Sequence, residues 1–172
     1  MGTSLAADPK SPTKSAGQRV LDYARARVEH KAPGRGTCWD FPFAALKHAG
    51  ASTPHDLGKD LYVWGQPVAR LEDAQPGDII QFFKVKVHRE WVRTYEKGGR
   101  TITETFKGHY TFADRHSAIV ERVEPGLFLT LLNAHLTGDK GRVSRLRLNL
   151  SPENVLSGTI YLYRPVERSS SP

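Results

Sequence analysis

The feature that most constrains this 172-residue chain is a junction between a loop and a helix that carries its only cysteine. The stretch from Gly34 to Gly50 reads GRGTCWDFPFAALKHAG, and Cys38 follows two glycines within it. From Phe41 onward apolar residues recur every four positions, which predicts a helix with one buried face. The ring of Pro42 would clash with the carbonyl four residues back, so the helix begins no earlier than about Cys38. The thiol therefore lies in or just before the first helical turn.

A thiol at this position has two interpretations. Unpaired N–H groups and the positive end of the helix dipole stabilise a thiolate, and the same N–H groups can stabilise an oxyanion. Cys38 is therefore a candidate nucleophile. The alternative is an inert buried thiol, which is the common state of a lone cysteine. Asp40 meets the helix dipole favourably, but it would raise the pKa of the thiol if it pointed inward.

The composition restricts the classes of protein to which the chain can belong. A length of 172 residues fits one domain with a substantial core. A single cysteine excludes an intramolecular disulfide framework and a zinc site built on several thiolates. No run of about 18 apolar residues is present, so we expect no membrane span. The net charge of +7 suits an anionic partner such as a cell-wall polymer, a nucleic acid or membrane headgroups.

The chain divides into one domain with a short segment at each end. Residues 1–14 are polar with two prolines, and we expect them to form a disordered leader. Residues 15–166 are expected to form a single domain, and residues 167–172 a polar, disordered tail. No charged-then-apolar signal peptide begins the chain. The location stays open, and a secreted or periplasmic protein whose export signal is absent from this chain is one alternative.

The order of the predicted elements indicates an α+β fold. Residues 15–30 have the spacing of an amphipathic helix, and a second helix follows Cys38. About six strands come next, and they form an antiparallel sheet on which the N-terminal helices pack. These strands are expected at 78–87, 101–112, 115–123, 127–136, 142–150 and 158–166. A Gly-Gly turn between Lys97 and Arg100 closes a long hairpin over 84–114.

His116 is the histidine best placed to act as a base for the thiol. It begins a strand, HSAIV, after the long hairpin, where the sheet faces a helix terminus. A base of this kind needs a third group that fixes its tautomer. Asn133 and His135 lie two residues apart on the following strand, so they share one face and either could orient His116. The alternative is that all three side chains are structural and hydrogen-bond to their surroundings.

Five short motifs follow one another along the chain. They are Gly36-Thr-Cys-Trp-Asp40, Ala45-Leu with Ala49-Gly-Ala51, Pro76-Gly-Asp-Ile-Ile-Gln-Phe82, His116-Ser-Ala-Ile-Val120, and a closing Gly158 with Tyr163-Arg-Pro165. Over residues 15–165 this ordered set resembles the papain-like amidases and peptidases that include CHAP domains (cysteine, histidine-dependent amidohydrolases/peptidases) and NlpC-type domains. The resemblance implies a papain-like core with Cys38 as nucleophile and His116 as general base. Such domains cleave amide bonds, often in peptidoglycan.

The third member of the site departs from the CHAP pattern. CHAP relatives often carry Glu-x-Asn on the strand after the histidine, whereas this chain has Asn133-Ala-His135. NlpC-type relatives commonly use a histidine, which favours His135, and papain-like enzymes use an asparagine, which suits Asn133. Both alternatives stay open. The resemblance does not cover the hairpin over 84–114, which could shape a substrate groove or bind a partner.

Hydrolysis of an amide bond by a thiol is the leading functional hypothesis. The substrate would contain an amide or a peptide, and a cell-wall polymer is one example. This mechanism requires no metal, and we expect no cofactor. The candidate substrate-binding residues are Trp39, Asp40, Tyr62 and Trp64, although Tyr62 and Trp64 fit a core as well as a groove wall.

The competing hypothesis is a catalytically silent relative that binds an anionic polymer or a protein through the basic hairpin. The altered Asn133-Ala-His135 pair and the net charge of +7 motivate it. Nucleic-acid binding has weaker support, because the chain contains no helix-turn-helix, zinc or RNA-recognition motif.

Overall fold

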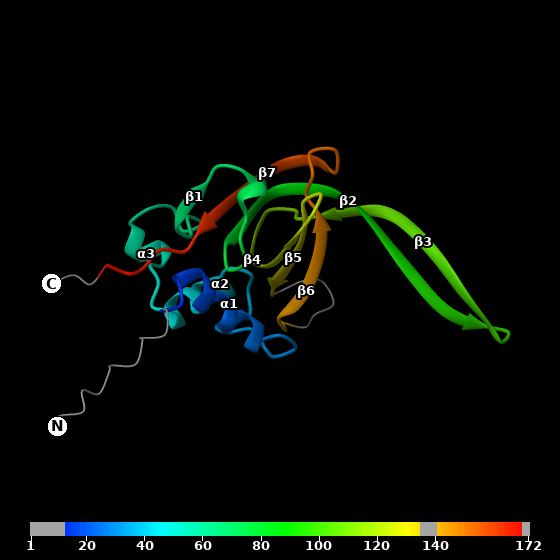
Figure 1. Ribbon diagram of the computed structural model, residues 1–172, viewed down its shortest axis with the longest axis horizontal. Helices are drawn as coiled ribbons and strands as arrows, with labels where there is room; N and C mark the ends of the chain where they lie inside the picture. The colour runs from blue at the N-terminus through cyan, green and yellow to red at the C-terminus, as the bar shows by residue number, and fades with distance from the viewer. Residues whose placement is uncertain (1–12, 135–140, 170–172) are drawn as a thin grey trace, which may run out of the picture.

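The computed structural model describes residues 13–134 and 141–169, and it shows an α+β fold. Three helices gather on one side of a curved antiparallel sheet, and a two-stranded arm extends from the other side (Figure 1). The helices are α1 (Ala16–Ala26), α2 (Asp40–His48) and α3 (Pro54–Leu57), with a 3-10 turn at Leu71–Asp73. The strands are β1 (Gln66–Val68), β2 (Ile79–Lys97), β3 (Arg100–Thr111), β4 (Arg115–Glu124), β5 (Phe128–Asn133), β6 (Ser144–Asn149) and β7 (Val155–Arg164).

Within the described ranges, seven strands form a single sheet in which every strand pair is antiparallel. The order is β1-β7-β2-β4-β5-β6, and β3 pairs only with the outer part of β2. Strand β4, which carries His116 near its start, therefore lies inside the sheet, between β2 and β5. Around His116 the backbone of β4 pairs with β2, opposite Phe82, and the pairing with β5 begins three residues later at Ile119.

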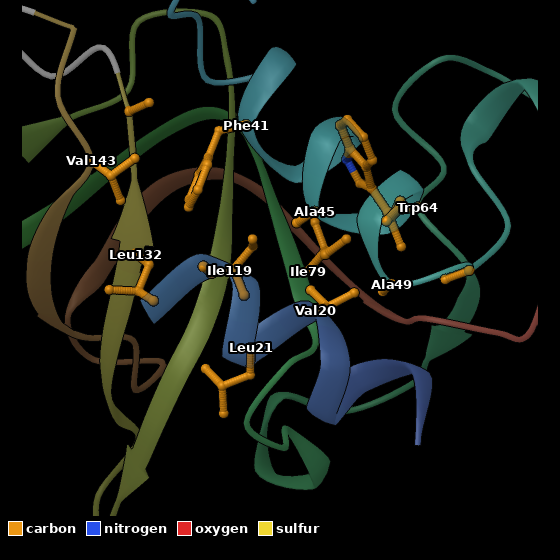
Figure 2. Packing of buried hydrophobic residues seen from close by; sticks show 14 of the residues in the cluster. Val20, Leu21, Phe41, Ala45, Ala49, Trp64, Ile79, Ile119, Leu132 and Val143 are labelled. Carbon is orange, nitrogen blue, oxygen red and sulfur yellow. The ribbon is translucent and has the colours of Figure 1, made fainter. Parts of the chain in front are cut away.

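The helices cover one face of the sheet through a shared apolar cluster (Figure 2). The side chain of Ser15 caps α1 by accepting from the N–H of Gln18, and the buried stripe of α1 includes Val20 and Leu21. The helix α2 contributes Phe41 and Ala45. Strands β2, β4 and β5 supply the opposing wall, and the fully buried residues of this cluster include Val20, Phe41, Ala45, Leu46, Trp64, Ile79, Ile119 and Leu132. Burial of this face holds α2, and with it the thiol loop, against β4.

A second apolar cluster lies on the opposite face of the sheet, because alternate residues of each strand point to opposite sides. Strand β2 contributes Ile80 and Phe82 to it, and β4 contributes Ala118 and Val120. His116 is two residues before Ala118, so its strand position belongs to this second face.

A buried ion pair explains two of the sequence motifs. Asp78 is 1% exposed, and its carboxylate accepts two hydrogen bonds from the guanidinium of Arg164, at 3.0 and 2.9 Å. The preceding Gly77 has φ of 95°, and a Cβ there would lie 2.1 Å from the carbonyl oxygen of Gly17. The Pro-Gly-Asp motif and the closing Tyr-Arg-Pro motif therefore meet in space. They anchor the start of β2 to the end of β7 and to α1.

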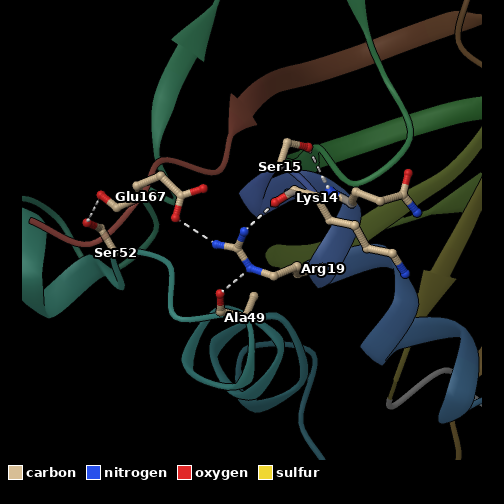
Figure 3. A network of polar contacts seen from close by, with 7 residues as sticks. Lys14, Ser15, Arg19, Ala49, Ser52 and Glu167 are labelled. Carbon is tan, nitrogen blue, oxygen red and sulfur yellow. Dashed lines mark hydrogen bonds and ion pairs between the residues drawn. The ribbon is translucent and has the colours of Figure 1, made fainter. Parts of the chain in front are cut away.

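Arg19 ties the first helix to the last described segment (Figure 3). Its guanidinium donates to the carbonyl of Ala49, at 2.7 Å, and to the carboxylate of Glu167, at 2.6 Å. The hydroxyl of Ser52 donates to the backbone carbonyl of Glu167. These contacts close the helical side of the domain.

The predicted hairpin over 84–114 is present, and most of it extends beyond the buried part of the sheet. β2 and β3 pair in continuous register from Lys86 with Thr111 to Lys97 with Arg100. Gly98 and Gly99 form the turn with φ of 59° and 72°, the positive values that a two-residue hairpin turn needs. We call the exposed part of this hairpin, residues 88–109, the arm.

Three local features differ from the sequence expectation. Residues 54–57 form α3, which a reciprocal capping box between Thr53 and Asp56 stabilises, although the predicted elements include no helix there. The short strand β1 adds a seventh strand and pairs with β7. The last strand, expected at 158–166, begins earlier, at Val155, directly after a turn in which the N–H of Asn154 donates to the carbonyl of Ser151.

Candidate active site

The only cysteine of the chain lies just before α2, as the sequence predicts. Trp39 is the N-cap residue of the helix, so Cys38 precedes the first helical residue by two positions. The hydroxyl of Thr37 accepts from the N–H of Asp40, which stabilises the turn. The approach to it needs Gly34, which has φ of 63° and whose added Cβ would press on the Asp40 carboxylate at 3.0 Å.

The sulfur of Cys38 lies against the start of β4. Its Sγ is 3.9 Å from the carbonyl oxygen of Arg115, to which the thiol donates. The backbone N–H of Ser117, on the other side of His116, acts to lower the pKa of the thiol. Arg115 and Ser117 flank His116 in the chain, so the sulfur lies beside the backbone that carries this histidine. Helix and sheet thus bring the thiol to the backbone beside His116, which lies 78 positions further along the sequence.

The environment of the thiol favours its protonated form. Burial raises the pKa of Cys38, and the negative charge of Asp40 raises it further. Hydrogen bonds from the backbone N–H groups of Ser117, Cys38 and Trp39 act in the opposite direction and are outweighed. The resting side chain is therefore a thiol that needs a base, and not a preformed thiolate.

Asn133 holds the ring of His116. The Nε2 atom of His116 is 3.0 Å from Oδ1 of Asn133, and both side chains are buried. The Nδ2 group of Asn133 donates to the carbonyl of Ser144, at 3.2 Å, which fixes the amide with its oxygen toward the histidine. Because an amide oxygen can only accept, Nε2 carries the proton in neutral His116. The other ring nitrogen, Nδ1, is then the basic one.

Aromatic packing also restricts the ring of His116. Phe112 stacks on it with ring centroids 4.7 Å apart and an interplanar angle of 19°. Phe82 stacks on Phe112 at 4.2 Å and lies 6.4 Å from the histidine ring. His116 is 7% exposed. The histidine is therefore oriented by the hydrogen bond with Asn133 and by a stack of two phenylalanines.

A buried polar residue that the sequence analysis does not single out supports the same strand. Gln81 is 3% exposed, and its Oε1 accepts from the hydroxyl of Ser117 and from the indole N–H of Trp64, at 3.1 Å. Its Nε2 donates to the carbonyl of Phe82. The signal available in the sequence is a lone polar side chain inside the apolar segment DIIQFF. Gln81 fixes Ser117, whose N–H approaches the sulfur.

The four predicted substrate-binding residues occupy different environments. Trp64 is fully buried in the core cluster, so of its two interpretations the structure shows the core. Trp39 is partly buried, stacks on Phe43 and donates to the carbonyl of Leu61, at 2.8 Å. Asp40 accepts from the N–H of Arg35. Burial raises the pKa of Asp40, but hydrogen bonds from Thr37 and Arg35 outweigh it and leave the pKa below its ordinary value.

Tyr62 borders a cavity beside the site. The guanidinium of Arg115 lies 4.5 Å above the Tyr62 ring and 3.7 Å from the carboxylate of Asp60. These residues line a cavity of about 370 Å³ together with Val63, Gln81, Phe83, Tyr161 and Tyr163. The cavity adjoins the backbone that contacts the sulfur, because the carbonyl of Arg115 is the one that faces Cys38.

His135, the other candidate for the third position, lies outside the described residues. Within the described ranges, no group of three or more histidine, cysteine, aspartate or glutamate side chains could hold a metal ion. No helix in those ranges is long and apolar enough to cross a membrane.

The comparisons with known proteins agree with the fold of the site. A family model described as AIM3/BBC1 Cysteine proteinase-fold domain matches residues 10–171. No curated protein and no solved structure matches the chain. The match supports a papain-like cysteine proteinase fold, whereas the finer resemblance to CHAP and NlpC-type amidases stays a prediction. Since the matched region spans nearly the whole sequence, the chain belongs to the AIM3/BBC1 cysteine proteinase-fold domain family.

Proposed function

We propose that this domain is a cysteine hydrolase that cleaves amide bonds with Cys38, His116 and Asn133. One observation carries the proposal. The sulfur of Cys38 contacts the backbone on either side of His116, while Asn133 binds the far nitrogen of the same ring. We infer that Cys38 is the nucleophile, His116 the base and Asn133 the group that orients the base, which are the three roles that thiol hydrolysis requires.

The proposed reaction begins with transfer of the thiol proton of Cys38 to Nδ1 of His116. The sulfur attacks the carbonyl carbon of the substrate and forms a tetrahedral oxyanion, which the N–H groups of Cys38 and Trp39 are placed to stabilise. His116 returns the proton to the leaving amine as the carbon–nitrogen bond breaks. Water, deprotonated by His116, then hydrolyses the thioester and restores the thiol.

The proposed substrate is a peptide or another chain that contains amide bonds. The cavity of about 370 Å³ beside Arg115 offers tyrosine rings and one ion-paired arginine to a side chain of the substrate. Tyr62 belongs to this proposed substrate site. Cell-wall peptides are one member of the proposed substrate class.

Two variants and a control test the proposal by release of amine from a fluorogenic peptide library. Cys38→Ala and His116→Ala should each abolish turnover, whereas His109→Ala, an exposed histidine in the arm, should leave it unchanged. Thermal unfolding of each variant separates loss of chemistry from loss of fold. Full activity in folded Cys38→Ala would refute the assignment.

A second candidate function is a catalytically silent binding domain, and the raised pKa of Cys38 favours it. Because this cysteine is the only one in the chain, iodoacetamide labelling reports on it alone. In a hydrolase, His116→Ala should slow labelling near neutral pH, because the histidine accepts the thiol proton. In a silent domain, labelling should follow the thiol alone and be the same in both proteins.

A further inference from the structure

The arm presents two faces of different chemistry. Cross-strand partners and residues two apart share a face. The register therefore places Trp91 and Phe106 on one face, and Val92 and Thr105 on the other. The first face, which we call the aromatic face, is made by Arg89, Trp91, Arg93, Tyr95, Lys97, Arg100, Ile102, Glu104, Phe106, Gly108 and Tyr110.

The two faces also differ in charge. The aromatic face carries four cations, Arg89, Arg93, Lys97 and Arg100, against the single carboxylate of Glu104. The opposite face consists of the alternate rows, from the pair of Lys86 with Thr111 to the pair of Glu96 with Thr101. It carries two lysines and two glutamates, and Lys107 lies 3.8 Å from Glu90. The basic charge of the arm is therefore concentrated where its aromatic rings are.

Arginine and aromatic side chains contact one another along the aromatic face. The guanidinium of Arg89 lies over the rings of Trp91 and Tyr110, at 5.7 and 5.6 Å. Arg93 lies 5.6 Å from the ring of Tyr95, and Trp91 stacks on Phe106 at 5.7 Å. Trp91 is 42% exposed and Phe106 36%, although both belong to the most apolar residue types. Among the residues of the aromatic face, Tyr110 packs against the second apolar cluster, whose buried members on β2 and next to β3 end at Val87 and Phe112, before the exposed rings of Trp91 and Phe106.

The aromatic face continues into two features of the body of the domain. At the root of the arm, Arg89 and Trp91 line a hollow of about 840 Å³ together with residues of the opposite face such as Glu90, Val92 and Lys107, and its other wall includes Phe128 and Arg147. There the guanidinium of Arg147 lies 4.2 Å over the ring of Phe128, an arginine–aromatic contact like those on the arm. The same row of rings also leads to the site, because Tyr110 contacts Phe112, and Phe112 stacks on His116.

We propose that the aromatic face of the arm binds an extended acidic polypeptide segment in which carboxylates alternate with apolar side chains. The spacing supports this occupant. Cationic rows at Arg89, Arg93 and Lys97 are four residues apart, about 14 Å, and the aromatic rows at Trp91 and Tyr95 lie midway between them. An extended peptide presents one side chain per face about every 7 Å. Acidic residues at every fourth position, with apolar residues between them, match both sets of rows.

A nucleic acid fits the same surface less well. A strand of duplex DNA carries one phosphate about every 3.4 Å, far more densely than the cationic rows of the arm. As a binding surface the arm does not depend on turnover, whereas delivery of the bound segment to Cys38 rests on the proposed function.

The test measures fluorescence anisotropy of a labelled peptide of about twelve residues with the repeat Glu-Ser-Leu-Ser, long enough to span about 40 Å. The protein carries Cys38→Ala, so binding is measured without cleavage. We expect saturable binding that weakens with added salt. A peptide of the same composition with its glutamates clustered at one end should bind at least tenfold more weakly.

Matched variants on the two faces of the arm locate the binding. Arg93→Glu and Trp91→Ala change the aromatic face, and each should lower the affinity at least tenfold. Thr94→Glu and Thr105→Ala change the opposite face outside the hollow, and each should alter the affinity less than twofold. Equal effects on the two faces, or equal binding of both peptides, would overturn the proposal. Tighter binding of a labelled oligo-dT than of the peptide would overturn it in favour of a nucleic acid.

Discussion

The two halves of β2 show how differently one strand can be used. Residues 79–87 are mostly buried, because β4 and β7 pair with them on either side and apolar clusters cover both faces. Residues 88–97 pair only with β3, and none of them is buried. The first half reads IIQFFKVKV and is mostly apolar, whereas the second reads HREWVRTYEK and sets Trp91, Val92 and Tyr95 among charged residues. The core accounts for the apolar residues of the first half, and we infer that an interaction outside the domain accounts for those of the second.

The first prediction compares the same kind of substitution in the two halves. Phe82→Ala removes a fully buried ring that stacks on Phe112, and it should lower the free energy of unfolding by about 3–5 kcal/mol. Trp91→Ala removes a larger ring that is 42% exposed, and it should cost about 1 kcal/mol or less. Urea unfolding monitored by circular dichroism measures both.

The outcome decides whether the arm is part of the cooperative core. If Trp91→Ala destabilised the domain as much as Phe82→Ala, the aromatic face would be required for folding. The argument that it serves a partner would then lose its basis.

The second prediction applies the same comparison to ion pairs. Asp78 is 1% exposed and bidentate with Arg164, so Asp78→Asn should cost about 2–4 kcal/mol, since it leaves a guanidinium without its charge partner. Glu90 and Lys107 pair on the surface of the arm with both side chains largely exposed. Glu90→Gln should change the free energy of unfolding by less than about 0.5 kcal/mol. A cost at Glu90 close to that at Asp78 would contradict the comparison.

The parts of the fold and of the site that lie within one short segment can be predicted from glycine positions and apolar spacing. The glycines before Cys38 and the apolar spacing after Phe41 indicate a thiol just before a helix, where the structure places it. Gly98 and Gly99 likewise indicate the turn of the arm. The apolar pattern does not predict α3, because four residues are too few to show helical spacing. The Thr53 and Asp56 capping box was its available signal.

Long-range contacts are the part that the sequence does not determine. Asp78 and Arg164 lie 86 positions apart, and nothing local to either indicates the other. Asn133 and His135 share one strand face by spacing, so spacing alone leaves the third residue open. The hydrogen bond from His116 to Asn133 is a tertiary feature that depends on the pairing of β5 with β6, through the carbonyl of Ser144.

The third prediction concerns the buried hydrogen bond at the candidate site, through which Asn133 orients His116. Asn133→Ala removes the acceptor that keeps the proton on Nε2 of His116. We expect turnover to fall about tenfold to a hundredfold, part of the 10²–10⁴-fold that a positioned acid–base group supplies. Asn133→Asp, which keeps an acceptor oxygen, should restore part of the loss and move the pH profile to higher pH, because a carboxylate stabilises the imidazolium.

Asn154→Ala provides the control, because Asn154 donates to Ser151 in a turn that makes no contact with the site. Turnover in this variant should match the parent. Unchanged turnover in a folded Asn133→Ala protein would assign Asn133 a purely structural role.

The smallest expected effect concerns the charge beside the thiol. The pKa of Cys38 is raised first by burial and then by the negative charge of Asp40, so its labelling by iodoacetamide should increase as the pH rises through that elevated pKa. Asp40→Asn removes the charge while its amide oxygen can still accept from the N–H of Arg35. The thiolate then forms more easily, the pKa falls, and the labelling curve should move to lower pH.

Asp22→Asn makes the same change on α1, where the carboxylate binds Lys14 and Gln18, and it should leave the labelling curve of Cys38 unmoved. A curve that stays in place in both variants would show that burial alone sets the thiol pKa. The thiol before α2 would then resemble the buried half of β2, where burial determines the properties of the side chains. A shift confined to Asp40→Asn would show that a charge at the start of the helix changes the pKa of the thiol independently of packing. In this respect the site would resemble the arm, whose charged residues do not pack in the core.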